Sequence, residues 1–102
     1  MALDVFWEQE DGGTIETCPV WYKPGEYVTD VLEFENTLCL KFIDDYGNTT
    51  FNQIQIPVLI EELESLLPKA KDAEARLALE TLIAFVRMAM GRVHTHIKFI
   101  GD

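Results

Sequence analysis

Two helical patterns follow one another in the second half of the chain, and both have marked ends. Pro57 stands where the first helix should begin, because proline at the first helical position costs no hydrogen bond, and Pro68 stands beyond its end. Asp72 can cap a second helix, and Gly91 can stop it. The sequence therefore predicts helices over residues 57–67 and 72–90.

Each predicted helix has an apolar face at helical spacing. In the first helix Leu59, Leu63 and Leu66 lie on one side. The second helix has a wider stripe, made by Ala75, Ala78, Leu79, Leu82, Val86 and Ala89. An arc this wide is either buried within the domain or covered in part by another chain. Helix 72–90 is therefore a candidate homodimer interface.

Segments on both sides of the helices read as strands. The alternation of Leu3, Val5 and Trp7 with their neighbours predicts a first strand, and a turn signal follows at residues 10–13. A second hairpin is expected where Leu38, Leu40 and Phe42 point inward before another turn signal. The five predicted strands cover residues 3–8, 14–21, 38–44, 49–55 and 93–100.

This order of elements predicts the fold class. We expect one α+β domain over residues 1–102, with a mainly antiparallel sheet of four to five strands in the order β-β-β-β-α-α-β. Two helices should cover one face of the sheet. With 48% hydrophobic residues, a chain of 102 residues can be held by its core, without disulfides or a structural metal.

The two cysteines and the amino terminus bear on the compartment. Cys18 and Cys39 form no Cys-x-x-Cys pair, so buried thiols are expected rather than a zinc or redox motif. The first residues lack a basic region followed by an apolar run, and no apolar stretch approaches the ~20 residues of a membrane span. These features favour a cytoplasmic protein.

The charge is strongly negative and unevenly distributed. The net charge is −10, with 14 acidic and 2 basic residues up to Glu64, but 4 acidic and 6 basic residues after it. Nucleic acids and anionic membranes both need a basic face, so neither is expected as a partner. A basic protein is the partner class that this charge favours.

Residues that could do chemistry are few. His94 and His96, two apart on a predicted strand, point to one face, where a third ligand such as Asp44, Asp102 or Cys18 would complete a metal site. That geometry makes a small metal-dependent enzyme one alternative, although a solvated strand face with Lys98 has the same pattern. Because no nucleophile motif or phosphate loop is present, we predict no catalytic residues and no cofactor.

The best functional signal is the combination of acidic and aromatic residues. Aromatic anchors within a charged rim are typical of protein interfaces. In small size, acidity and lack of catalytic groups the chain resembles bacterial immunity proteins that neutralise a basic toxin, although no motif assigns it to that class. We predict a non-enzymatic protein-binding module, with a self-associating structural or regulatory subunit as the other alternative. The predicted partner-binding residues are Trp21, Tyr22, Glu26, Asp30, Glu33, Glu35, Glu61, Glu62 and Glu64.

Overall fold

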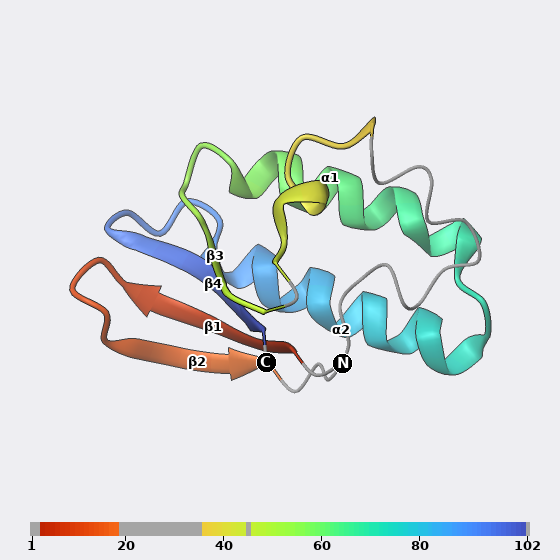
Figure 1. Ribbon diagram of the computed structural model, residues 1–102, viewed down its shortest axis with the longest axis horizontal. Coiled ribbons are helices and arrows are strands. Elements are labelled where there is room, and N and C mark those ends of the chain that lie inside the picture. Colours follow the sequence, from red (N-terminus) through yellow and green to blue (C-terminus); the bar gives the residue numbers. More distant parts are fainter. Residues whose placement is uncertain (1–2, 19–35, 45, 102) are drawn as a thin grey trace.

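A four-stranded antiparallel sheet forms one layer of the protein (Figure 1). The computed structural model describes residues 3–18, 36–44 and 46–101. The strand order is β2-β1-β4-β3. The strands are β1 (Leu3–Gln9), β2 (Thr14–Cys18), β3 (Asn48–Phe51) and β4 (Thr95–Gly101).

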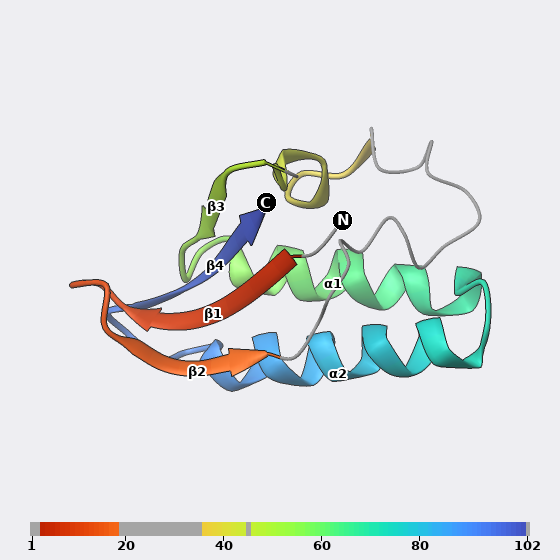
Figure 2. The ribbon, with the colours of Figure 1, turned by 60° about the horizontal axis from the view of Figure 1, so that its bottom comes forward.

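Two helices form the second layer and lie side by side on one face of the sheet (Figure 2). They are α1 (Ile56–Leu66) and α2 (Ala73–Ala89). Two short 3-10 segments accompany them, η3 (Leu40–Phe42) and η4 (Leu67–Lys69). The predicted α+β class, with an antiparallel sheet and two helices, is confirmed. No described helix is long and apolar enough to cross a membrane.

The core lies between the sheet and the helices. Leu3, Val5 and Trp7 are all buried, as the alternation in β1 predicts, because successive side chains of a strand point to opposite faces. In β4, Ile97 and Phe99 pair with Trp7 and Val5 across the ladder. This inner face of the two central strands is continuous with the buried face of the helices.

The ends of α2 follow the capping rules. The Asp72 carboxylate accepts a hydrogen bond from the backbone N–H of Ala75 at 2.7 Å, and Arg87 lies in the last turn, where a cation favours the helix dipole. Gly91, with φ of 78°, follows the helix. Most of the wide apolar arc is buried within the domain, but Leu77 and Met88 are exposed.

The strand predicted over residues 38–44 is wrong. This segment forms η3 instead, with Leu38 68% and Phe42 63% exposed, while Cys39 and Leu40 are buried. The physical reason is a side chain distant in sequence. The Glu62 carboxylate on α1 accepts hydrogen bonds from three successive backbone N–H groups, those of Leu38 (2.6 Å), Cys39 (3.0 Å) and Leu40 (3.1 Å). Only three strands therefore precede the helices in the described residues.

Two other strand boundaries differ from the prediction. β3 ends at Phe51 because the Asn52 side chain accepts hydrogen bonds from the backbone N–H groups of Ile54 and Gln55, which starts the turn into α1. β4 begins at Thr95, because the preceding His94 has a left-handed φ of 62° that breaks the extended chain. Val93, the first residue of the predicted strand, therefore lies before β4 and is exposed.

Both cysteines are buried and neither forms a disulfide, as predicted. The pKa of the Cys39 thiol lies above its ordinary value, first because burial desolvates the thiolate and second because the Glu62 carboxylate repels it. Cys39 is therefore kept in its protonated, unreactive form near neutral pH.

Candidate functional site

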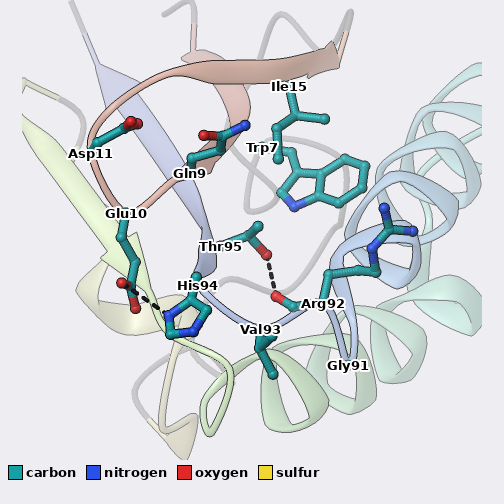
Figure 3. A pocket seen from close by; sticks show the side chains of 10 residues that line it. All are labelled: Trp7, Gln9, Glu10, Asp11, Ile15, Gly91, Arg92, Val93, His94 and Thr95. Atoms are coloured by element: carbon teal, nitrogen blue, oxygen red, sulfur yellow. Dashed lines mark hydrogen bonds and ion pairs between the residues drawn. The ribbon is translucent and has the colours of Figure 1, made fainter.

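An open groove of about 590 Å³ lies between the β1–β2 hairpin and the loop that joins α2 to β4 (Figure 3). Residues from β1 and the hairpin turn form one wall, and residues 91–95 form the other. These two segments are far apart in sequence and come together because β1 and β4 are neighbours in the sheet.

The hairpin wall is shaped by a tight turn and a β-bulge. Gly12, with φ of 94°, lets the chain reverse, and the Asp11 carboxylate accepts a hydrogen bond from the Gly13 N–H at 2.9 Å. In the ladder Trp7 pairs with Glu16, whereas Glu8 pairs with Thr14. Ile15 is thus the extra residue of the bulge, a device that redirects side chains, and it lines the groove.

The opposite wall is held by Gln53, which precedes α1. Its amide nitrogen donates to the backbone carbonyls of Ala89 at 2.9 Å and Thr95 at 3.2 Å, and its amide oxygen accepts from the Gly91 N–H at 3.0 Å. The two walls are joined by a hydrogen bond from the Glu10 N–H to the His94 carbonyl at 2.9 Å. The loop is therefore built into the fold at both ends.

Trp7 lies at the inner side of the groove. It is only 5% exposed, yet its indole N–H has no hydrogen-bond partner among the described residues. Leaving a buried donor unsatisfied costs about 1–3 kcal/mol, so native structures rarely keep one without a reason. The Arg92 guanidinium lies over the indole ring, 5.4 Å from the centroid, in a cation–π contact.

The hairpin brings exposed carboxylates to the rim of the groove. Glu10 and Asp11 line the groove, and Glu16 lies next to the lining residue Ile15 on β2. All three are exposed, and no lysine or arginine pairs with them within the described ranges. Glu10 contacts the ring nitrogen of His94 at 3.2 Å. One end of the groove is therefore negative, while Arg92 makes the other end positive (Figure 3).

The two histidines have separate partners. His94 lies before β4 and contacts Glu10, whereas His96, within β4, contacts the buried Glu8 at 3.0 Å. Lys98 lies 3.9 Å from the same Glu8 oxygen. Among the residues that the structure describes, no group of three or more potential ligands is close enough to hold a metal ion. His94 and His96 therefore have no third metal ligand beside them in this part of the molecule.

The predicted partner-binding residues separate into two groups, those on α1 and those outside the described residues. On α1, Glu61 is exposed, Glu62 is used by η3 and Glu64 pairs with Arg87 at 2.8 Å. The acidic residues of α1 are thus partly neutralised within the fold. The remaining predicted residues, Trp21, Tyr22, Glu26, Asp30, Glu33 and Glu35, lie outside the described residues.

Sequence reasoning missed the groove itself. The pattern assigns Trp7 to the core and Arg92 to the end of a helix, and neither assignment indicates that the two side chains meet. The turn signal at residues 10–13 predicted the hairpin turn, but Glu10 and Asp11 were not among the predicted partner-binding residues. The loop between α2 and β4 gave no signal beyond Gly91.

Comparison with protein-family models, with curated proteins and with solved structures gave no match for this chain. The fold and the groove define a small α+β protein with a charged cleft at the end of its sheet. Its function is inferred from the geometry of that cleft.

Proposed function

We propose that the protein is a non-enzymatic binding module that receives a basic segment of a partner protein at the acidic wall of the groove. The observation that carries this proposal is the set of carboxylates on the β1–β2 hairpin, Glu10, Asp11 and Glu16, which no lysine or arginine neutralises in the described structure. Glu10 and Asp11 line the groove together with Trp7 and Ile15.

Such a wall has the properties that recognition of a cationic segment requires. Clustered carboxylates raise the rate of encounter with a basic partner and disfavour acidic ones. Tryptophan and arginine at a cleft are the residue types in which binding energy concentrates. The net charge of −10 extends the attraction beyond the contact itself.

A more specific form of this proposal is an immunity-type inhibitor that covers a basic toxin. An acidic surface suits that task, because a toxin that acts on nucleic acid needs a basic face. Two cysteines without a disulfide favour the reducing cytoplasm as the place where it acts.

The test is affinity capture with two charge-matched double variants. We expect Glu10→Gln with Asp11→Asn to reduce capture of a basic protein from a lysate of the source cells by roughly tenfold, the effect of losing about 1.4 kcal/mol of charge pairing. Capture should fall between about 50 and 500 mM salt, because exposed charges are screened. The control, Glu74→Gln with Glu80→Gln on α2, makes the same charge change and should leave capture unchanged. Equal loss in both variants, or indifference to salt, would refute the proposal.

Self-association is the second candidate function, and one surface favours it. Leu77, Thr81, Ala84 and Met88 form an exposed stripe of low polarity along α2. Sedimentation over a range of concentrations should detect a dimer at tens of micromolar, and Leu77→Glu should dissociate it. A strict monomer at every concentration would remove this function.

A further inference from the structure

We infer that the Arg92 end of the groove is a carboxylate-binding subsite, formed by the indole N–H of Trp7 and the guanidinium of Arg92. Its ligand is a peptide segment that carries a carboxylate close to a basic residue. The identification of the ligand as a protein segment rests on the proposed function, whereas the carboxylate chemistry of the subsite does not.

The indole N–H of Trp7 is a buried donor without a partner among the described residues. The Trp7 side chain is more than nine-tenths buried, and its N–H edge faces the middle of the groove, between Arg92 and Thr95 (Figure 3). The nearby Thr95 hydroxyl is already engaged, since it donates to the Arg92 carbonyl and accepts from the Gln53 amide. A ligand oxygen is the acceptor that this donor lacks.

Arg92 differs from the other two arginines in its contacts. The chain has three arginines, and two of them are paired, Arg76 with Glu80 at 3.0 Å and Arg87 with Glu64 at 2.8 Å. Arg92 has no carboxylate partner in the described structure, although the protein has 18 acidic residues. It rests instead on the face of Trp7. A planar guanidinium is suited to pair with both oxygens of a carboxylate.

The Trp7 N–H and the Arg92 guanidinium would bind one carboxylate together. In the structure the Trp7 N–H is closed off from solvent, and the guanidinium covers the ring. When a carboxylate enters the groove, Arg92 turns from the face of the ring toward it. One ligand oxygen then accepts from the Trp7 N–H and the other from Arg92. Arg92 thus rests on the face of Trp7 in the empty subsite and contacts the ligand when the carboxylate binds.

The opposite end of the groove defines the rest of the ligand. Glu10 and Asp11 repel a simple anion but attract an ammonium or guanidinium group. A dipolar segment, with lysine or arginine toward the hairpin and aspartate, glutamate or a chain terminus toward Arg92, satisfies both ends. Such a segment also has no net negative charge to oppose its approach to an acidic protein.

Nuclear magnetic resonance of the tryptophan indole N–H groups tests the subsite directly. Trp7→Phe identifies the Trp7 signal. Acetate is the simplest probe, added up to about 50 mM because a lone charge-assisted contact gives only millimolar affinity, with sodium chloride as the ionic-strength control. We expect acetate to shift the Trp7 signal in the native protein and in Arg76→Gln, but not in Arg92→Gln. No shift, or a shift that persists in Arg92→Gln, overturns the subsite.

Two matched peptides test the ligand class. Acetyl-Lys-Gly-Glu-amide should bind at least about fivefold more tightly than acetyl-Lys-Gly-Gln-amide, since only the first offers a carboxylate to Arg92. Free glutamate tests whether the ligand is a small molecule instead of a peptide. If glutamate binds more tightly than acetyl-Lys-Gly-Glu-amide, the assignment of a peptide ligand is wrong.

The failures of the two proposals are distinguishable. Glu10→Gln with Asp11→Asn should weaken peptide binding but leave the acetate shift intact. If acetate shifts the Trp7 signal but the double variant binds the peptide as tightly as the native protein does, the proposed function is wrong and the subsite is supported. If the lysine peptides bind through Glu10 and Asp11 but acetate never shifts the Trp7 signal, the subsite alone fails.

Discussion

Replacing Leu82 with alanine is expected to lower the free energy of unfolding by about 2–5 kcal/mol. Leu82 is 0% exposed in the middle of α2, where the helix packs against the rest of the core. The change removes the transfer free energy of the lost methyl groups and leaves a cavity that close-packed neighbours fill only in part. Urea unfolding followed by circular dichroism measures the loss as a lower midpoint with an unchanged slope.

Leu77 is the matched control for this prediction. It lies on the same helix but is 64% exposed, so Leu77→Ala should change stability by no more than about 0.5 kcal/mol. Comparable losses in the two variants would contradict the assignment of the buried face of α2. A loss at Leu77 that grows with protein concentration would instead identify its stripe as a dimer interface.

Glu62→Ala is expected to lower the free energy of unfolding by about 2–3 kcal/mol, a large effect for a partly exposed charged residue. Its carboxylate accepts hydrogen bonds from the backbone N–H groups of residues 38, 39 and 40, and two of these hydrogen bonds are partly buried. Without it, the donors lose their acceptors and the adjoining buried side chains of Cys39 and Leu40 lose their anchor to α1. Urea unfolding measures the stability, and hydrogen exchange should become faster at residues 38–40.

Two further variants separate the role of the carboxylate from a general charge effect. Glu62→Gln keeps one acceptor oxygen but turns an amide NH₂ toward the same donors, so we expect a smaller loss of about 1–2 kcal/mol. Glu61→Ala removes a neighbouring exposed charge and should change stability by less than about 0.5 kcal/mol. A Glu61 variant as destabilised as the Glu62 variant would disprove the specific role of Glu62.

Glu62 also illustrates the limit of sequence reasoning about function. From the sequence it is one of three acidic residues on an exposed helix face and a natural member of a binding surface. In the structure its side chain satisfies a segment more than twenty positions earlier in the chain. Surface carboxylates have the same pattern whether they face solvent or a backbone, and only the packing of η3 against α1 distinguishes the two cases.

The candidate site was accessible to sequence reasoning only in part. The turn at residues 10–13 and the end of α2 near Gly91 were both predicted from local signals, because glycine and turn residues act on their immediate neighbours. The meeting of these two segments depends on the pairing of β1 with β4, which are separated by more than eighty residues. No local pattern encodes that pairing, so the contact between Trp7 and Arg92 could not be foreseen.

Local patterns alone were enough to establish the elements whose side chains repeat with a regular period. The inward face of β1 and the ends of α1 and α2 follow from alternation, proline and capping chemistry, which act over a few residues. Long-range contacts decided the rest: a carboxylate on α1 made residues 40–42 a 3-10 turn, and sheet pairing formed the groove. The physical reason is that a backbone N–H donates to any suitable acceptor, and which acceptor it meets depends on how distant elements pack.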